Sequence, residues 1–241
     1  MTSPALLAPA AAATVFGAAL PSLEAYAALL AGPGVERGLL GPREAPRLWE
    51  RHLLNCAGLS ELIEDGSVVL DLGSGAGLPG IVLALLRPQI QLVLVEPLLR
   101  RATFLSEVVQ TLGLRTVVVR RARAEELHGA VEVDVVTARA VAPLERLGGW
   151  AMPLLRPGGR LLALKGDQAQ AELDAALPVL RRVGAASADV VEVGSALLST
   201  DARVIVATRS AAAGARVRAA GRPSSSRPGG ISATSKRKDH R

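Results

Sequence analysis

The chain has 241 residues, of which 49% are hydrophobic and 2% aromatic, and its formal net charge is +6 at pH 7. This composition is sufficient for one domain with an aliphatic core and a short appendage. The single cysteine, Cys56, excludes an internal disulfide framework and fits a reducing cytosol, so we expect a cytoplasmic protein.

Residues 1–66 are predicted to be helical. Apolar residues recur at three- and four-residue steps between Pro46 and Leu62, as on one face of a helix. The apolar stretch Ala5–Leu20 lacks the basic leader of a signal peptide, and we interpret it as leading into a helix. No apolar stretch reaches the roughly 20 residues of a membrane-spanning helix, so we expect no membrane association.

From Ser67 onward, strands alternate with helices. The candidate strands are 67–72, 90–95, 115–120, 133–137 and 159–164, and the candidate helices are 79–86, 97–112, 143–154 and 168–182. Strands separated by single helices predict βαβ units and a parallel sheet. Ala188–Val193 and Arg203–Thr208 are separated by only a loop, which predicts an antiparallel strand or pair at the end of the sheet.

Residues 209–241 form a basic tail. They carry nine Lys or Arg and one acid, Asp239, for a net charge of +8, so the remaining 208 residues sum to −2. From Ser210 the sequence has no periodicity and is predicted to be disordered in isolation. We expect the tail to contact nucleic-acid phosphate, and a dispensable solubilising extension is the alternative.

The most distinctive motif follows the first predicted strand. It consists of an acid, three alternating glycines and a proline: Asp71, Gly73, Gly75, Gly77 and Pro79. Strand, glycine turn and helix in this order are typical of nucleotide sites in α/β sheets. The dinucleotide fingerprint needs a third glycine where Leu78 stands, which favours a nucleoside ligand without a pyrophosphate. A purely structural turn is the alternative.

A polar side chain is expected at the end of each of five parallel strands: Asp71, Glu96, Glu125, Arg139 and Lys165. Strand ends of this kind lie at one edge of a parallel sheet, so we expect these groups to share a ligand site. A carboxylate at 96 can accept hydrogen bonds from two ribose hydroxyls, and a cation at 139 can hold a carboxylate or phosphate. No Cys and His have metal-ligand spacing, so no metal is expected.

Five sequence blocks together resemble a known family. They are Leu48–Trp49–x–Arg51–His52, Asp71–Gly80, Arg123–Ala124–Glu125, Ala138–Arg139–Ala140 and Ala163–Leu164–Lys165–Gly166. In this order they closely resemble the RsmG family, also called glucose-inhibited division protein B, over roughly residues 14–208. Two positions depart from the family pattern, because Asn55 and Glu96 stand where relatives often carry aspartate.

The resemblance implies a methyltransferase that uses S-adenosylmethionine to modify guanine N7 in 16S rRNA of the small ribosomal subunit. It implies a Rossmann-like class I methyltransferase sheet, mostly parallel with an antiparallel C-terminal strand, preceded by N-terminal helices. The chain would then comprise a helical segment 1–66 packed on the catalytic domain, a methyltransferase domain 67–208 and the tail 209–241. The expected partner is 16S rRNA or a small-subunit particle, and the protein is expected to be a monomer.

The resemblance places cofactor contacts on Gly73, Leu78, Ala124, Glu125 and Arg139. The strand ends add Asp71 and Glu96, and the glycine turn adds Gly75 and Gly77. Guanine N7 has a lone pair and no proton, so methyl transfer requires alignment rather than a general base. The candidate catalytic residues are Arg139, Lys165, His52 and Arg51, where Arg139 and Lys165 would hold RNA phosphate, the guanine edge or the methionine carboxylate.

Blander readings also stay open. From its position alone His52 is more often a core or capping histidine than a catalytic residue, and Arg51 is by default a solvated surface charge. The alternative functions are another S-adenosylmethionine-dependent methyltransferase, a nicotinamide-dependent oxidoreductase, and a non-enzymatic RNA-binding protein.

Overall fold

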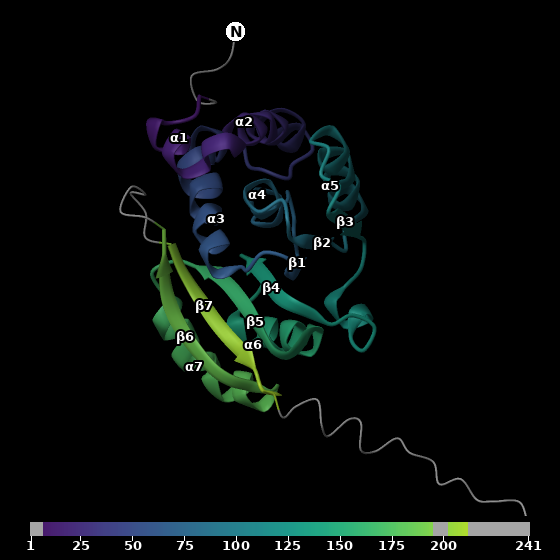
Figure 1. Ribbon diagram of the computed structural model, residues 1–241, viewed down its shortest axis with the longest axis vertical. Coiled ribbons are helices and arrows are strands. Elements are labelled where there is room, and N and C mark those ends of the chain that lie inside the picture. The colour runs from purple at the N-terminus through teal and green to yellow at the C-terminus, as the bar shows by residue number, and fades with distance from the viewer. Residues whose placement is uncertain (1–6, 195–201, 212–241) are drawn as a thin grey trace, which may run out of the picture.

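The computed structural model describes residues 7–194 and 202–211, which contain a seven-stranded sheet in the order β3-β2-β1-β4-β5-β7-β6 (Figure 1). The strands are β1 (Val68–Leu72), β2 (Gln91–Val95), β3 (Val117–Arg120), β4 (Val133–Arg139), β5 (Leu155–Lys165), β6 (Ala185–Val193) and β7 (Ala202–Arg209). β1 to β5 are parallel to one another, and β7 runs antiparallel to both β5 and β6. The carboxyl ends of β1 to β5 therefore lie at one edge.

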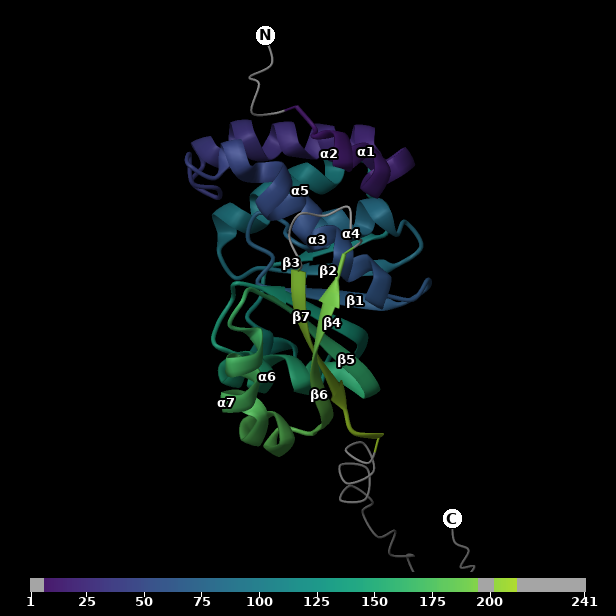
Figure 2. The same ribbon diagram turned by 90° about the vertical axis from the view of Figure 1, so that its left-hand side faces the viewer.

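Helices cover both faces of the sheet. The helices are α1 (Ala10–Phe16), α2 (Leu20–Leu29), α3 (Asn55–Ala57), α4 (Gly80–Leu86), α5 (Leu99–Thr111), α6 (Leu144–Ala151) and α7 (Ala169–Arg182). Irregular helical turns at Leu30–Gly34, Ala45–Arg47, Leu48–Leu54 and Gly58–Leu62 continue the N-terminal part, and others lie at Gly17–Ala19, Ala124–Leu127 and Met152–Leu154. The helices α1 to α5 lie on one side of the sheet and α6 and α7 on the other (Figures 1 and 2).

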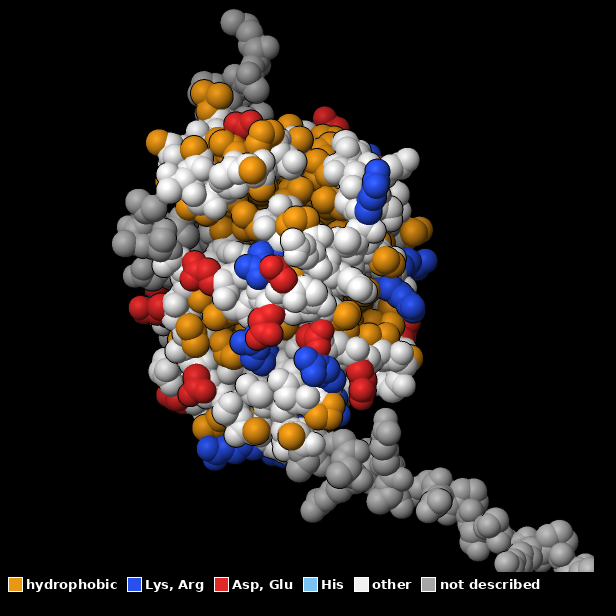
Figure 3. Space-filling view, in the orientation of Figure 1, with side chains coloured by type: hydrophobic (Ala, Val, Ile, Leu, Met, Phe, Trp, Pro, Cys, Tyr) orange, Lys and Arg blue, Asp and Glu red, His pale blue; other side chains and the backbone are white. Residues whose placement is uncertain are grey.

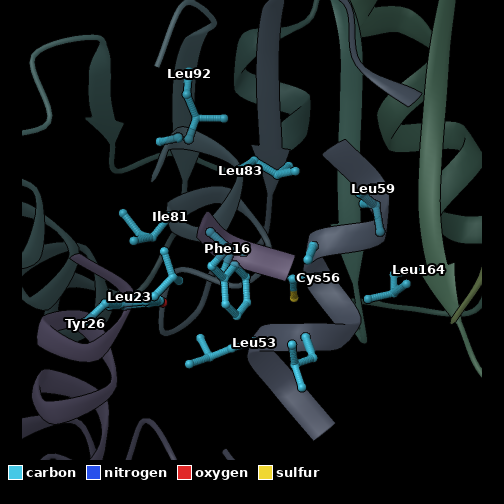
Figure 4. Packing of buried hydrophobic residues seen from close by; sticks show 14 of the residues in the cluster. Phe16, Leu23, Tyr26, Leu53, Cys56, Leu59, Ile81, Leu83, Leu92 and Leu164 are labelled. Carbon is cyan, nitrogen blue, oxygen red and sulfur yellow. The ribbon is translucent and has the colours of Figure 1, made fainter. Parts of the chain in front are cut away.

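Each side of the sheet has its own hydrophobic core. The larger core joins the N-terminal helices to α4, α5 and the sheet, and Figure 4 shows Phe16, Leu23 and Tyr26 beside Ile81 of α4. The smaller core lies between the sheet and α6 and α7. The N-terminal helices thus share a continuous core with the sheet. The division of the chain at 66/67 and 208/209 stays a prediction, and residues 212–241 of the tail lie outside the described residues.

The predicted order of elements, the mostly parallel sheet and the antiparallel C-terminal strand are confirmed. The strand predicted at 159–164 begins earlier, at Leu155. Its pairing with β4 shifts register between Val133 and Val135, and Gly158 there has a φ of +80°. This irregular start has no apolar alternation, which is why the sequence pattern did not reveal it.

One helical run, Ala10–Gly34, is long and apolar enough to cross a membrane by length and composition. The expectation that no apolar stretch reaches that length is therefore wrong, because the turn at Gly17–Ala19 joins α1 to α2 and the turn at Leu30–Gly34 extends the run beyond α2. In the most apolar 18-residue stretch of this run, 28% of the residues are buried. Leu23, Tyr26 and Leu30 of the run are fully buried in the larger core.

Tyr26 connects this run to the glycine turn after β1. Its hydroxyl donates a hydrogen bond to the carbonyl oxygen of Ala76 over 2.9 Å. A Cβ at Gly77, which has a φ of +103°, would lie 2.8 Å from the same hydroxyl oxygen. The fully buried Tyr26 side chain of α2 therefore restricts the backbone conformation of the glycine turn.

We predict that Tyr26→Phe lowers the free energy of unfolding by about 1 kcal/mol, because Ala76 loses its hydrogen-bond donor while the ring still fills the core. Urea unfolding followed by the fluorescence of Trp49 and Trp150 measures this change. An unchanged midpoint and slope would show that the hydroxyl does not support the turn.

Candidate functional site

A cavity of about 380 Å³ opens at the carboxyl edge of the sheet, beside the ends of β1 to β4. Its apolar walls come from Leu72, Val95, Pro97, Leu98, Ala122, Ala124 and Val141, with Trp150 of α6 at one side. The polar lining includes Glu96, Arg101, Arg123 and Glu125. An apolar slot with a few convergent polar groups is typical of a small-molecule site.

Glu96 is the buried anion of this cavity, with a relative exposure of 2%. Its carboxylate accepts hydrogen bonds from the amides of Gly75 and Leu98, each over 3.0 Å, and its Oε2 lies 3.8 Å from the Arg101 guanidinium. A carboxylate offers about four acceptor positions. Two amides leave acceptor capacity for a hydroxyl-bearing ligand.

The glycine turn is held against β2 through its backbone. The amides of Gly73 and Ser74 both donate to the carbonyl oxygen of Val95, over 2.9 and 3.1 Å. Gly75 has a φ of +58°, and the nearest atom to a Cβ there is 3.8 Å away. The backbone conformation at position 75 thus favours glycine, and the position faces open space.

Asp71 lies behind the turn rather than in the cavity lining. Its fully buried carboxylate accepts from the Thr137 hydroxyl over 3.0 Å and from the Gly80 amide over 3.2 Å. Burial raises the pKa of Asp71 to about 6, although hydrogen bonds from Thr137, Ser74 and Gly80 oppose that shift. Asp71 therefore holds the Gly80 amide at the start of α4 and the Thr137 hydroxyl of β4.

Arg139, the last residue of β4, contacts the N-terminal helices. Its guanidinium donates to Nδ1 of His52 and to Sγ of Cys56, the latter over 3.5 Å. His52 Nε2 lies 2.8 Å from a carboxylate oxygen of Glu44, and Arg51 pairs with the same carboxylate over 3.3 Å. Two blocks that are 87 residues apart in sequence are thus brought into one hydrogen-bonded chain.

The direction of these hydrogen bonds determines the protonation of His52. Arginine can only donate, so Nδ1 must accept and Nε2 must carry the proton that it donates to Glu44. Burial and the nearby Arg139 lower the pKa of His52, which keeps the ring neutral at pH 7. The hydrogen bond from His52 lowers the pKa of Glu44 in turn.

Lys165 lies at the carboxyl edge as expected, but its ammonium is already paired. It contacts Glu172 of α7 over 2.6 Å and the carbonyl oxygen of Ala142 over 3.5 Å. The same Glu172 carboxylate accepts from the amide of Leu144. Lys165 thus connects β5, α7 and the start of α6.

The site residues predicted from the sequence fall in three places. Gly73, Glu96, Ala124 and Glu125 line the cavity, and Arg139, His52 and Arg51 form the neighbouring hydrogen-bonded chain. Gly77 and Leu78 pack toward the core that contains Tyr26. The ligand roles of all these residues stay predictions. The sequence pattern did not identify Glu44, Tyr26, Arg101 or Trp150, because each reaches the site through tertiary packing alone.

Comparisons with known proteins identify close relatives. Residues 19–196 match the family described as rRNA small subunit methyltransferase G. The chain is 54% identical over 220 residues to the ribosomal RNA small subunit methyltransferase G of Thermobifida fusca, covering 91% of this chain and 93% of the relative. It is 57% identical over 192 residues to the protein of the same name from Streptomyces coelicolor, covering 79% and 80%.

Solved structures share the fold. A SAM-dependent O-methyltransferase of Thermotoga maritima has a TM-score of 0.53 and 17% identity, with 65% of this chain and 64% of that chain covered. Fibrillarin of Aeropyrum pernix, in complex with natively bound S-adenosyl-L-methionine, has a TM-score of 0.50 and 23% identity, covering 66% and 75%. The predicted Rossmann-like methyltransferase fold is confirmed.

We predict that Glu44→Ala releases the His52 ring, because Nε2–H loses its acceptor and Nδ1 becomes protonated in part of the molecules. Long-range proton–nitrogen NMR resolves the rings of the three histidines. The His52 ring should show the Nε2–H tautomer alone in the wild type and a mixture of tautomers in the variant. Since Arg139 then loses its acceptor, S-adenosylmethionine should bind about fivefold more weakly, the effect of roughly 1 kcal/mol.

Glu50→Ala is the matched control, because Glu50 is an exposed acid on the helical turn Leu48–Leu54 that carries His52. It should leave the tautomer and the affinity unchanged. A wild-type His52 spectrum in Glu44→Ala would contradict the assigned role of Glu44.

Proposed function

The chain belongs to the rRNA small subunit methyltransferase G family, and we propose that it binds S-adenosylmethionine in the cavity at the carboxyl edge of β1 to β4. The buried Glu96 carboxylate carries this proposal. It lies in an apolar slot, and the amide of Gly75 connects it to the glycine turn. Its remaining acceptor positions match the two ribose hydroxyls of a nucleoside.

The other lining residues fit the remaining parts of the cofactor. The apolar side chains of Val95, Leu98 and Ala124 suit an adenine ring, and Glu125 lies beside them. The open space in front of Gly75 allows a ligand to approach the backbone. Arg139 provides a cation for a carboxylate, with its orientation fixed by His52 and Cys56.

The reaction is methyl transfer from S-adenosylmethionine to small-subunit rRNA, and the cofactor supplies a methyl group that its sulfonium already activates. We infer that the acceptor atom is guanine N7, which has an in-plane lone pair and no proton to remove. The protein therefore needs no general base. Holding acceptor and donor in line can contribute about 7–11 kcal/mol to lowering the barrier.

The target base must reach the cavity from an exposed loop or by leaving its stack. We propose that Arg139 orients the substrate or the methionine carboxylate, and that Lys165 keeps the β5 edge in place through Glu172. We expect a cytoplasmic monomer that acts on rRNA or a small-subunit particle, with the basic tail 209–241 adding phosphate contacts.

A direct test incubates the purified protein with small-subunit rRNA, or the particle, and cofactor carrying a labelled methyl group. We expect 7-methylguanine, detected by strand scission after reduction and aniline treatment. Arg139→Ala should reduce the rate more than tenfold, or about 1.4 kcal/mol of barrier. Label in another nucleoside would contradict the N7 assignment, and absence of label would contradict the function.

We predict that Gly75→Val abolishes cofactor binding in calorimetry, because its side chain would occupy the space in front of the turn. Gly113→Val is the matched control for backbone strain. Gly113 has a φ of +64°, close to the +58° of Gly75, and no atom lies within 4 Å of a Cβ there. Gly113 follows α5 at the opposite edge of the sheet.

Both variants should lose stability, since left-handed backbone costs a branched residue about 1–2 kcal/mol or more. Only Gly75→Val should lose the cofactor. Equal affinity in the two folded variants would mean that the turn does not contact the ligand. The Gly75→Ala and Gly113→Ala pair repeats the comparison if the valine variants prove too unstable to purify.

A further inference from the structure

Positive charge in the folded part of the chain is concentrated in one segment. Residues 97–123 contain six arginines and one acid, Glu107, for a net charge of +5, whereas residues 1–208 as a whole sum to −2. Glu107 pairs with Arg37 over 2.6 Å, so it does not neutralise the segment's own arginines. Figure 3 shows blue Lys and Arg side chains along the margin where Figure 1 places α5 and β3.

The fold gathers five of these arginines at the carboxyl edge of the sheet. Two stand in the first turn of α5 and three at or just after the end of β3: Arg100, Arg101, Arg120, Arg121 and Arg123. These two stretches lie side by side, because the Glu96 amide donates to the Arg120 carbonyl oxygen over 3.1 Å and Arg121 Nε donates to the Pro97 carbonyl oxygen over 3.4 Å. We call this group the arginine surface.

The arginine surface borders the cofactor cavity. Arg101 and Arg123 line the cavity wall, while Arg100, Arg120 and Arg121 are exposed outside that lining. Arg101 lies 3.8 Å from Glu96, and its Nε is buried without a hydrogen-bond partner among the described residues. Ligands at this surface would therefore lie next to the bound cofactor.

The nearby acids do not balance the five arginines. Glu96, Glu125 and Glu126 are the acids next to them in the sequence, so five positive minus three negative charges leave +2. Glu96 is already engaged by the amides of Gly75 and Leu98. Arginines in the first turn of α5 also oppose the helix dipole, which favours acids there. The arrangement is therefore unfavourable for the isolated protein.

The cofactor does not account for this surface either. S-adenosylmethionine has no phosphate, and its one anionic group is a single carboxylate, for which Arg139 is available. Five guanidinium groups exceed that need. Forked guanidinium groups along an exposed edge fit the repeating phosphates of a polynucleotide, which they bind through paired hydrogen bonds.

We propose that the arginine surface docks the phosphate backbone of the substrate RNA beside the nucleotide that is methylated. This rests on the proposed function and adds where the RNA lies on the folded body. Phosphate contacts of this kind set the register of the RNA and leave base recognition to the cavity. The basic tail is a separate element, because β7 ends at Arg209 beside Ala185, at the opposite edge of the sheet.

The test compares two tandem arginine pairs in the full-length protein. R120A/R121A removes two exposed charges at the carboxyl edge, and R181A/R182A removes two exposed charges at the end of α7, at the amino edge. The substrate is small-subunit rRNA, and the binding constant is measured from low to high salt. Cofactor affinity and methylation rate are measured on the same preparations.

R120A/R121A should weaken RNA binding and reduce the slope of log K against log salt by about 1.4–1.8, or 0.7–0.9 for each phosphate that is no longer neutralised. Its KM for RNA should rise while kcat and the cofactor affinity stay near wild type. R181A/R182A should match wild type throughout. The pair R100A/R120A keeps the hydrogen bond from Arg121 to Pro97 and should reduce the slope by the same amount.

A wild-type slope in both R120A/R121A and R100A/R120A, with methylation intact, would overturn the docking surface and leave the proposed function standing. An equal reduction in R181A/R182A would overturn it too, because binding would then depend on total charge alone. A wild-type protein that does not methylate the RNA would instead contradict the proposed function.

Discussion

The buried carboxylate of Asp71 is the constraint on which the site depends. It is fully buried at the end of β1 and joins that strand to Thr137 on β4 and to the amide of Gly80 at the start of α4. Burial raises its pKa to about 6, so an ionised group at neutral pH needs these hydrogen bonds to stay in place. The turn between Asp71 and Gly80 therefore has two fixed ends, and the amides of Gly73 and Gly75 within it donate to Val95 at the end of β2 and to Glu96.

The N-terminal helices complete what the sheet alone leaves unfinished. Tyr26 supports the back of the glycine turn, and His52 and Cys56 hold the guanidinium of Arg139. A long arginine side chain at a strand end has many rotamers, and fixing it before a ligand binds reduces the entropy lost on binding. The helices thus hold the glycine turn and the Arg139 side chain in place as well as covering the core.

The exposed arginines and the apolar cavity occupy different parts of the same sheet edge. The cavity proposed for the cofactor is mostly apolar with a buried carboxylate, while the arginines gather at its rim along β3 and α5. A nucleoside needs shape and a few hydrogen bonds, whereas a polynucleotide needs several positive charges along an edge. With both proposed sites at one sheet edge, cofactor and RNA would bind side by side, as a bimolecular transfer requires.

The sequence by itself determined the order of strands and helices, the glycine turn and the edge where the polar strand ends meet, because those features depend on local periodicity and on parallel pairing. It also indicated Arg139 and His52, but only as separate blocks. Tertiary structure alone decided that Asp71 faces the protein, that Lys165 is paired with Glu172, and that Glu44 orients His52. These outcomes depend on which side chains meet across the sheet edge. His52 and Arg139 are 87 positions apart, so their contact produces no periodic pattern in the sequence.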